Sequence, residues 1–478
     1  MMNLRLSEIA TLLGAPLIGA DATVSSVGSD SRQVAAGMLF VALVGEHFDG
    51  HTFVPEACAR GAAGALVASG WQPPADSSSN PSPHPSADRP VAYIPVPDPL
   101  VALSELAAHW RRRFTLPVIA VTGSNGKTTV KEMIAACLRS AAAAQGLNAE
   151  TAVLATRGNR NNHIGVPLTV LELSDRHRYA VIELGMNHPG EIAQLARQVA
   201  PEVALVNNVQ REHLEFMETT EAVARENASV FLALSAQGVA VFPADDALTP
   251  LLREVAGERP GIDFALDGEA AVRGRFQPEG LMHRLWLDTP VGAAEVLLRV
   301  PGVHNVRNAL AASACVIAAG VGLDAVVEGL GAFRGVPGRQ QLRPGLHGSL
   351  LIDDSYNANP DSVRAGIDVL AATLGRKVLV LGDMGEVGDR AYEFHAEIGG
   401  YAKSQGVDHL FAIGEHAAVT AHDFGAGAQH FRRLDDLIAA ARRTLDAYTA
   451  VLIKGSRFMR MERVADALAA SPETDHAA

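Results

Sequence analysis

Short apolar runs alternate with longer stretches of helical spacing along most of the chain. Runs rich in valine, leucine and isoleucine predict buried strands at residues 37–43, 64–67, 118–121, 151–155, 179–182, 203–206, 350–353, 377–382, 410–414 and 450–454. Stretches between such runs, for example 6–13 and the alanine-rich 309–323, predict helices. This order of elements is typical of α/β folds, in which helices cover parallel sheets.

The length of the chain and the breaks in its pattern predict three domains. A chain of 478 residues corresponds to about three domains of roughly 150 residues each. We expect them at 1–97, 98–336 and 337–478, with a hinge at the Arg-Gly-Val-Pro-Gly run 334–338. Residues 72–90 hold six prolines and five serines, which predicts a flexible surface insertion or linker.

Composition and charge narrow the classes of function. The 40 basic and 53 acidic residues give a net charge of −13, which disfavours nucleic acid or an anionic membrane as the main partner. Three cysteines, Cys58, Cys137 and Cys315, stand singly without metal-ligand spacing, and we interpret them as buried thiols of a reducing compartment. The N-terminal stretch has no long apolar run or cleavage site, and 309–323 is shorter than a bilayer span. We therefore expect a cytoplasmic protein without membrane insertion.

The strongest candidate for chemistry is the run Thr-Gly-Ser-Asn-Gly-Lys-Thr-Thr at 122–129. It follows a predicted strand and opens a helical stretch, as phosphate-binding loops do. Glycines let backbone N–H groups face an anion, the helix N-terminus adds partial positive charge, and Lys127 can reach the outer phosphates. The loop predicts bound ATP or GTP in a shorter form of the Walker pattern, because Val121 stands where that pattern has glycine. The alternative is a glycine turn with a solvated lysine.

Two further candidates follow predicted strands. Glu183 ends the strand at 179–182, and His213 follows the strand at 203–206. The carboxyl ends of parallel strands face the ligand crevice. Glu183 can therefore bind magnesium, which prefers oxygen ligands, and His213 can be a ligand at the same edge. The alternatives are a glutamate that caps its loop and a structural histidine.

Two asparagine pairs are candidates for ligand contacts. Asn159 and Asn162 lie in a loop between glycines and can contact substrate, with a plain turn as the alternative. Asn305 and Asn308 share one face of the first turn of a helix and can contact nucleotide, although capping explains one of them equally well.

Two polar runs in the outer domains can also bind ligands. The Ser-Asp-Ser-Arg turn at 29–32 can bind a phosphate or a nucleotide sugar, or be an ordinary loop. The run Asp-Asp-Ser-Tyr-Asn-Ala-Asn-Pro at 353–360 follows a predicted strand and can hold ribose, a base or a small zwitterion. The third domain has no Gly-x-Gly-x-x-Gly loop, so NAD is not predicted.

Together these motifs resemble the Mur ligase family. The family's pattern occurs in order across all three predicted domains, in the phosphate loop, Glu183, His213, Asn305, Asn308, Arg339 and Asp353. Within the family, Asp-Ser-Tyr-Asn-Ala-Asn-Pro at 354–360 resembles the ligase that adds the last dipeptide. The Tyr-Ala-His and Asp-Asn-Pro-Arg motifs typical of the ligase for the third residue do not occur in the sequence.

The resemblance implies a fold, a reaction and ligands. The fold is a three-domain α/β architecture with a central phosphate-loop domain of parallel strands and a Rossmann-like C-terminal domain. The reaction is an ATP-dependent ligation in peptidoglycan synthesis, in which ATP phosphorylates a carboxylate and an amine then attacks the acyl phosphate. The implied substrates are UDP-N-acetylmuramoyl-tripeptide and D-alanyl-D-alanine, the implied cofactors are ATP and Mg²⁺, and we expect a monomer.

The resemblance also assigns roles to residues. The catalytic set is Lys127, Glu183 and His213, and the magnesium ligands are Thr128, Glu183 and His213. The ATP-binding set is Gly123, Ser124, Asn125, Gly126, Lys127, Thr128, Thr129, Asn305, Asn308, Arg339 and Asp353. UDP is assigned to Ser29, Asp30, Ser31, Arg32 and Phe40, the muramoyl or peptide part to Asn159 and Asn162, and the dipeptide to Tyr356, Asn357 and Asn359.

One position departs from the family. Members commonly carry a carbamylated lysine that supports a second magnesium, and Asn227 stands at the corresponding place. Our hypothesis is that no carbamate forms and that His213 still lies near a metal. The second magnesium is then held more weakly, or by another carboxylate such as Glu226, and Lys131 is a possible substitute for the family's lysine. Two rival functions stay open, namely a folate polyglutamate ligase and an inactive nucleotide-binding regulator.

Overall fold

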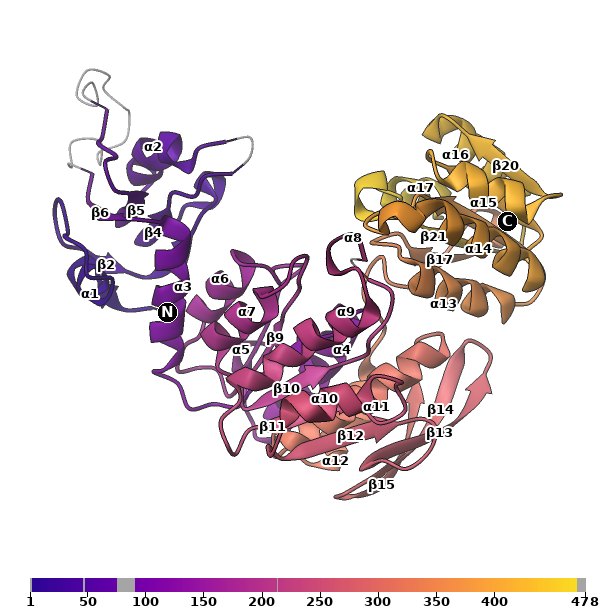
Figure 1. The fold of residues 1–478 in the computed structure, drawn as a ribbon, viewed down its shortest axis with the longest axis horizontal. Coiled ribbons are helices and arrows are strands. Elements are labelled where there is room, and N and C mark those ends of the chain that lie inside the picture. The colour runs from indigo at the N-terminus through magenta and orange to yellow at the C-terminus, as the bar shows by residue number, and fades with distance from the viewer. Residues whose placement is uncertain (1, 46–47, 75–90, 213, 471–478) are drawn as a thin grey trace.

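Three bodies follow one another along the chain, each built around its own sheet (Figure 1). The computed structural model describes residues 2–45, 48–74, 91–212 and 214–470. Most of the predicted insertion at 72–90, and His213, lie outside these ranges. The predicted three-domain α/β architecture is confirmed, while the domain boundaries stay predictions.

The N-terminal body holds a parallel four-stranded sheet in the order β3-β4-β5-β6. Its strands are β3 (Ser26–Gly28), β4 (Met38–Val41), β5 (Gly64–Ala68) and β6 (Tyr93–Val96). A small antiparallel pair, β1 (Leu4–Arg5) and β2 (Thr23–Val24), lies beside α1 (Leu6–Leu12), and α2 (Val54–Ala59) packs near β5.

The central body holds a nine-stranded sheet in the order β15-β14-β13-β12-β11-β10-β7-β9-β8. Its parallel strands are β7 (Val118–Thr122), β8 (Val153–Ala155), β9 (Tyr179–Glu183), β10 (Val203–Val206), β11 (Val239–Pro243) and β12 (Gly261–Ala265). Because Thr122 pairs with Val206 and Val121 pairs with Glu183, the strands β10, β7 and β9 end at the same level. The loops after these three strands therefore meet at one edge of the sheet.

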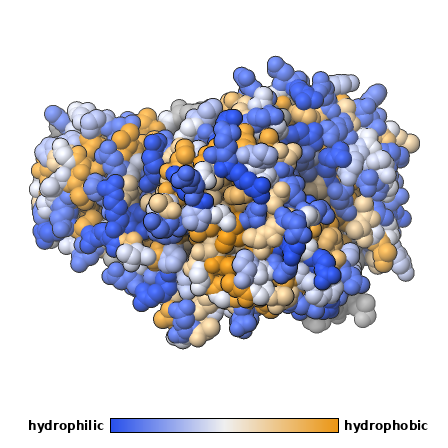
Figure 2. All heavy atoms as spheres, turned by 60° about the horizontal axis from the view of Figure 1, so that its bottom comes forward, coloured by the Kyte–Doolittle hydropathy of each residue, from blue (hydrophilic) through white to orange (hydrophobic). Residues whose placement is uncertain are grey.

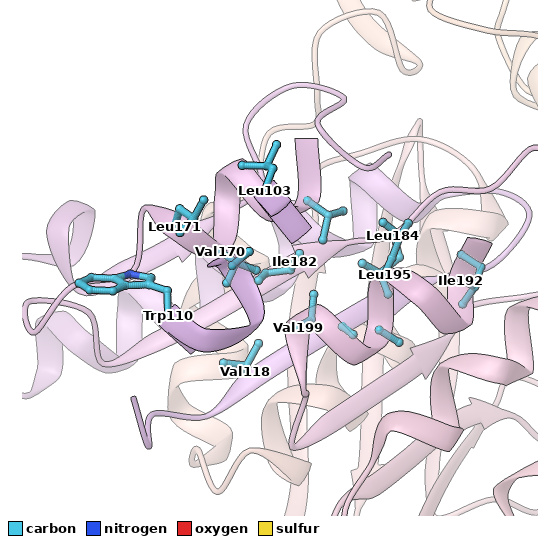
Figure 3. Close-up of a cluster of buried hydrophobic side chains, with 14 of the residues drawn as sticks. Leu103, Trp110, Val118, Val170, Leu171, Ile182, Leu184, Ile192, Leu195 and Val199 are labelled. Atoms are coloured by element: carbon cyan, nitrogen blue, oxygen red, sulfur yellow. The ribbon is translucent and has the colours of Figure 1, made fainter. Parts of the chain in front are cut away.

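Helices cover both faces of the central sheet. One face packs against α3 (Pro99–Arg111), α6 (Gly165–Leu171), α7 (Glu191–Val199) and α9 (Thr220–Ala228), and the other against α4 (Lys127–Ala144), α11 (Val303–Ala318) and α12 (Leu323–Ala332). Figure 3 shows the first core, where Trp110, Val170 and Ile182 lie among leucines and valines. Burying one such side chain contributes about 1.5–3 kcal/mol, and the Nε1 of Trp110 also donates to the carbonyl of Leu173 at 3.0 Å. This packing fixes the strand ends that carry the loops.

The far edge of the central sheet differs from the predicted parallel pattern. Strand β13 (Val272–Glu279) pairs parallel with β12, but β14 (Met282–Thr289) and β15 (Gly292–Leu298) continue it as an antiparallel meander. Alternation of buried and partly exposed positions along β14 fits a sheet with one covered face. The sequence reading missed these strands because it searched for continuous apolar runs.

Several element predictions were wrong in their bounds; the strand expected at 37–43, for example, is the shorter β4 (Met38–Val41). The strand expected at 151–155 begins only at Val153, because Ala149–Ala152 forms the short helix α5, capped by the Asn148 side chain. The helix expected at 309–323 is two helices, since α11 ends at Ala318 and α12 starts at Leu323. The remaining central helices are α8 (Leu214–Met217) and α10 (Thr249–Ala256).

The C-terminal body holds a six-stranded sheet in the order β16-β17-β21-β18-β19-β20, parallel except for β16. Its strands are β16 (Gln341–Pro344), β17 (Leu350–Asp354), β18 (Arg376–Gly382), β19 (His409–Ile413), β20 (Ala428–Phe431) and β21 (Thr449–Lys454). Helices α13 (Pro360–Ala371) and α14 (Ala391–Ser404) share one core, α16 (Leu434–Thr444) and α17 (Glu462–Leu468) the other, and α15 (Ala417–Phe424) packs on α14.

Polar residues cover much of the surface in the view of Figure 2, with apolar areas between them. None of the described helices is both long and apolar enough to cross a bilayer. Cys137 and Cys315 are buried as predicted, and burial raises the pKa of the Cys137 thiol to about 12. Cys58 is only partly buried, so the prediction of three buried thiols was wrong for it.

Candidate active site

The phosphate loop connects β7 to α4 and needs glycine at two positions. Gly123 has a φ of 125° and Gly126 a φ of 78°, a region that residues with a Cβ rarely adopt. A Cβ on Gly123 would lie 2.9 Å from the backbone nitrogen of Asn207, and one on Gly126 would lie 2.7 Å from Oδ1 of Asn308. Helix α4 begins directly after Gly126, so the unpaired N–H groups of its first turn lie at the end of the loop.

The loop rests on polar side chains that follow β10. The Nδ2 of Asn207 donates to the carbonyl of Asn125 at 2.8 Å, and Oδ1 of Asn208 accepts from the Asn125 backbone N–H at 2.8 Å. Gln210 accepts from Nδ2 of Asn125 at 2.6 Å, and its backbone N–H donates to Oγ of Ser124 at 2.9 Å. Sequence reasoning missed these three residues, although the polar run after the strand was visible, because only His213 in that run is a common ligand type.

Lys127 is held inside the loop by three groups. Its Nζ donates to the carbonyls of Gly123 at 2.7 Å and Ser124 at 2.9 Å, and lies 3.0 Å from Oε1 of Glu212. The side chains of Lys127 and Glu212 are 14% and 12% exposed. The ammonium is therefore already at the loop, and Glu212 is its counter-ion.

Thr128 and Glu183 each bring a buried oxygen that lacks a hydrogen-bond partner within the described residues. These atoms are Oγ1 of Thr128 and Oε2 of Glu183. The other oxygen of Glu183, Oε1, accepts from Nδ2 of Asn161 at 2.8 Å, which fixes the carboxylate; sequence reasoning did not select Asn161. Buried polar atoms normally have partners, so two orphan oxygens beside a phosphate loop point to a missing ligand.

One cavity of about 870 Å³ contains most of the predicted site. The predicted residues that line it are Ser124, Asn125, Gly126, Lys127, Thr128, Thr129, Asn159, Asn162, Glu183, Asn305, Asn308, Arg339, Tyr356, Asn357 and Asn359. The central and C-terminal bodies both contribute, and Asn359 donates from Nδ2 to Oδ1 of Asn125 across the gap at 2.9 Å. The phosphate loop thus faces the polar run after β17.

The Asn305 and Asn308 pair is linked to the phosphate loop. Nδ2 of Asn308 donates to Oδ1 of Asn305 at 3.0 Å, which confirms that the two share one face of α11. Oδ1 of Asn308 accepts from Nδ2 of Asn207 at 3.0 Å. Neither caps the helix, because the N-cap residue is Gly302. The pair therefore supports the loop from the α11 side.

A buried ion pair shapes the C-terminal side of the cavity. Nζ of Lys454 donates to Oδ2 of Asp354 at 2.7 Å and to the carbonyl of Asn357 at 2.8 Å. Burial raises the pKa of Asp354, although the Lys454 ammonium opposes this shift. Nearby, the guanidinium of Arg339 stacks on the ring of Tyr356, 4.1 Å from its centre. The loop after β17 is therefore held in place from two sides.

Several predicted residues lie away from the cavity. Gly123 and Asp353 do not line it, and the Asp353 carboxylate accepts from the Arg343 guanidinium and from Oγ of Ser355. Phe40 is 1% exposed within the core of the N-terminal body. In the turn 29–32 Asp30 accepts two hydrogen bonds from the Arg32 guanidinium, which lowers the pKa of the Asp30 carboxyl. These residues lie outside the cavity, and their assigned roles stay predictions.

Helix α11 also brings His304, which sequence reasoning passed over, to the cavity wall. Burial, with a contribution from the Lys454 ammonium, lowers the pKa of His304 to about 4. The imidazole is therefore neutral near pH 7.

Asn227, which stands where family members commonly have a lysine, has a structural role. Asn227 is 1% exposed, and its Oδ1 accepts from Oγ1 of Thr122 at 2.6 Å and from the backbone N–H of Gly123 at 2.9 Å. Glu226 accepts from the backbone N–H groups of Gly190 and Ile192, each at 2.8 Å, so both of its oxygens bind the start of α7. The hypothesis that Glu226 holds a second metal stays untested, because each of these oxygens keeps a further lone pair.

Lys131, the other substitute that we considered, is also engaged. It is fully buried, and its Nζ donates to the carbonyl of Thr156 at 2.8 Å and to the carboxylate of Glu132. Among the described residues, no group of three or more His, Cys, Asp or Glu side chains is placed to hold a metal.

Comparisons with known proteins agree with this geometry. The family model described as Mur ligase middle domain matches residues 121–316, that described as Mur ligase, glutamate ligase domain matches 338–457, and that described as Mur ligase family, catalytic domain matches 23–111. The chain is 39% identical over 474 residues to the UDP-N-acetylmuramoyl-tripeptide--D-alanyl-D-alanine ligase of Escherichia coli strain K12, covering 98% of this chain and 99% of that protein.

The chain is also similar to solved structures of Mur ligases. A crystal structure of MurF from Acinetobacter baumannii has a TM-score of 0.86 at 32% identity, covering 97% of this chain and 98% of that one. MurF ligase from Thermotoga maritima in complex with ADP has a TM-score of 0.78 at 26% identity, covering 92% and 96%.

Proposed function

The chain belongs to the Mur ligase family, and we propose that it joins D-alanyl-D-alanine to UDP-N-acetylmuramoyl-tripeptide with ATP as the energy source. The observation that carries this proposal is the cavity between the phosphate loop and the run 354–360, in a chain whose relatives of nearly equal length carry this reaction in their names. The product is the corresponding pentapeptide precursor of peptidoglycan. Because ATP is a cytoplasmic substrate, we infer a cytoplasmic protein, and we propose that it is a monomer.

The reaction needs an activated carboxylate. An amine cannot displace oxide from a carboxylate, because oxide is too poor a leaving group. ATP therefore transfers its terminal phosphoryl group to the terminal carboxylate of the tripeptide, which gives an acyl phosphate and ADP. The amine of D-alanyl-D-alanine then attacks the acyl carbon, and phosphate leaves with one of the former carboxylate oxygens.

The phosphate loop positions and stabilises the transferring group. Its backbone N–H groups and the start of α4 bind the phosphates, and Lys127 exchanges the Glu212 carboxylate for their oxygens. Because the ammonium is already held by the carbonyls of Gly123 and Ser124, little reorganisation is needed. Asn305, Asn308 and Arg339 are our proposed contacts for the rest of the nucleotide.

Magnesium fits the orphan oxygens of Thr128 and Glu183. Hydroxyl and carboxylate oxygens are ligands that this ion prefers, and both atoms lack a partner within the described residues. When bound, the ion neutralises phosphate charge and orients the transfer. No larger cluster of His, Cys, Asp and Glu side chains lies within the described ranges. His213, our third proposed ligand, lies outside them.

The C-terminal body brings the acceptor to the acyl phosphate. Tyr356, Asn357 and Asn359 line the cavity opposite the loop, and we propose that they bind the dipeptide. The acceptor amine must lose its proton before it attacks. Asn359 contacts Asn125 across this side of the cavity, and we propose that closure of the C-terminal body keeps water from the acyl phosphate. The N-terminal turn 29–32, with Phe40, is our proposed UDP site, and Asn159 and Asn162 bind the muramoyl or peptide part.

ADP release tests this proposal. Purified protein with Mg²⁺ and ATP receives UDP-N-acetylmuramoyl-tripeptide and D-alanyl-D-alanine, with each component omitted in turn. We expect turnover only with all components. Turnover with a folate acceptor and glutamate instead would favour the folate polyglutamate ligase, and ATP binding without turnover on any acceptor would favour the inactive regulator.

A further inference from the structure

Arg211 joins the central body to the C-terminal body. Its Nη2 donates to Oδ1 of Asp361 at 2.6 Å and its backbone N–H donates to Oδ2 of the same carboxylate at 2.9 Å. Nη1 donates to Oε2 of Glu397 at 2.9 Å, and the guanidinium also lies over the ring of Phe394, 5.3 Å from its centre. Asp361 belongs to the first turn of α13 and Glu397 to α14. One side chain therefore contacts two helices of the other body.

The two residues beside Arg211 hold the phosphate loop. Gln210 binds Ser124 and Asn125, and Glu212 binds the ammonium of Lys127. Three consecutive residues thus contact the loop, the C-terminal body and the loop lysine in turn. Because the segment 210–212 is short, a shift of Arg211 must move at least one of its neighbours.

The contacts of Arg211 also determine which residues of the C-terminal body face the phosphate loop. Asp361 lies two residues after Asn359, whose side chain caps α13 and contacts Asn125. Holding Asp361 therefore holds the start of α13, and with it the predicted dipeptide-binding run, against the phosphate loop. Arg211 and Glu397 themselves do not line the cavity, so they act through other residues.

We propose that residues 210–212 couple docking of the C-terminal body to the phosphate loop, with Arg211 as the positioning residue. This inference rests on the proposed ligase reaction, since docking brings the acceptor to the activated carboxylate. Arg211 is suited to the task because its planar guanidinium binds two carboxylates at once, which an ammonium cannot do with the same geometry.

Kinetics test the coupling. Arg211→Met is expected to lower kcat at least tenfold and to raise the Kd for ATP by a smaller factor, because Gln210 and Glu212 shift with residue 211 but keep their own contacts with the loop. The matched control is Arg364→Met, which removes another guanidinium from the same Glu397, where Nη1 donates to Oε1 at 3.0 Å without crossing between bodies. We expect its kcat to stay within about twofold of wild type. Equal losses in both variants, or an ATP affinity that falls as much as kcat, would overturn the proposal.

A distance measurement is independent of turnover. Leu232 in the central body is 60% exposed and Leu374 in the C-terminal body 94% exposed, so cysteines at these positions accept fluorescent labels after Cys58→Ser. We expect Arg211→Met to broaden the distance distribution toward longer values and Arg364→Met to leave it unchanged. An unchanged distribution in Arg211→Met would refute docking by this residue, even if the ligase reaction itself were wrong.

Arg211→Lys guards against loss of folding. Lysine keeps the charge but not the double contact, so kcat and the distance distribution are expected between those of wild type and Arg211→Met. If Arg211→Met does not fold, Arg211→Lys decides the question alone. Wild-type behaviour of the lysine variant in both measurements would contradict the proposed geometry.

Discussion

The ammonium of Lys127 and the carboxylate of Glu212 form an ion pair at the phosphate loop, with Nζ 3.0 Å from Oε1. Both side chains are mostly buried, so salt screens the pair less than a surface pair. In the proposed ATP site, phosphate oxygens would compete with Glu212 for this cation. The ion pair would then set part of the free energy with which a nucleotide binds.

Glu212→Gln tests this competition. The amide keeps the shape of the side chain but loses its charge, so Lys127 becomes more available to phosphate. We expect the Kd for ATP, measured by calorimetry with Mg²⁺, to fall by a few-fold, about 1 kcal/mol or less. Glu215→Gln, on an exposed side chain three residues further on, is the control and should change nothing. Weaker binding in Glu212→Gln would show that this carboxylate itself helps to bind the nucleotide or its metal.

Glu183→Gln tests the magnesium site. The variant still accepts from Nδ2 of Asn161, so the fold of the loop is preserved, but the orphan oxygen loses its charge. We expect the Mg²⁺ concentration for half-maximal activity to rise at least tenfold and kcat to fall by about 100-fold or more. Thermal unfolding without metal should match wild type. An unaltered Mg²⁺ requirement would remove Glu183 from the site.

Asn227→Leu tests the support of the phosphate loop. Leucine has a similar volume but leaves the N–H of Gly123 and the hydroxyl of Thr122 without their buried acceptor. We expect a loss of about 1–3 kcal/mol in the free energy of unfolding of the central body and weaker ATP binding, measured by urea denaturation and calorimetry. Asn227→Asp keeps the acceptor and should retain more of the ATP affinity. A fully stable leucine variant would contradict the role that we assign to Asn227.

Acid should destabilise the protein between about pH 7 and pH 5. Burial lowers the pKa values of His177, His283, His304 and His395, that of His304 to about 4. Below the ordinary histidine pKa of about 6.5 the unfolded chain takes up protons that the folded chain does not, so stability falls as the pH falls. Asp354 contributes to the pH dependence of stability with the opposite sign, because its pKa is raised in the folded chain. It is one such group, whereas four histidines have lowered pKa values.

Thermal unfolding at pH 7 and pH 5 measures this effect. We expect a lower Tm at pH 5 than at pH 7. In His304→Gln the loss of unfolding free energy between these two pH values should be smaller by on the order of 1 kcal/mol. A Tm that stays constant or rises at pH 5 would mean that these histidines take up protons in the folded chain.

The phosphate loop could be predicted from the sequence because the residues that form it are adjacent along the chain. An apolar run, glycines at fixed spacing and a helix start place Gly126 and Lys127 without any long-range information. The strand ends at Glu183 and Val206 could be predicted because parallel strands present their carboxyl ends at one edge, and the pairing of Thr122 with Val206 shows this alignment.

The supporting contacts could not be predicted, because amide side chains in loops have no periodic signal. Asn161, Asn207 and Gln210 come from different loops and meet only after the sheet forms. Alternation along β17 explains another difference. Asp353 and Asp354 are adjacent and so point to opposite faces, and it is Asp354 that lines the cavity, whereas the resemblance selected Asp353.

The fate of a labelled oxygen tests the central claim most directly. The terminal carboxylate of UDP-N-acetylmuramoyl-tripeptide is labelled with ¹⁸O and incubated with the protein, ATP, Mg²⁺ and D-alanyl-D-alanine, and the released phosphate is analysed by mass spectrometry. The account predicts one ¹⁸O atom in each phosphate, because the carboxylate oxygen leaves with the phosphoryl group. Phosphate without label, or phosphate released without the acceptor at the same rate, would contradict it.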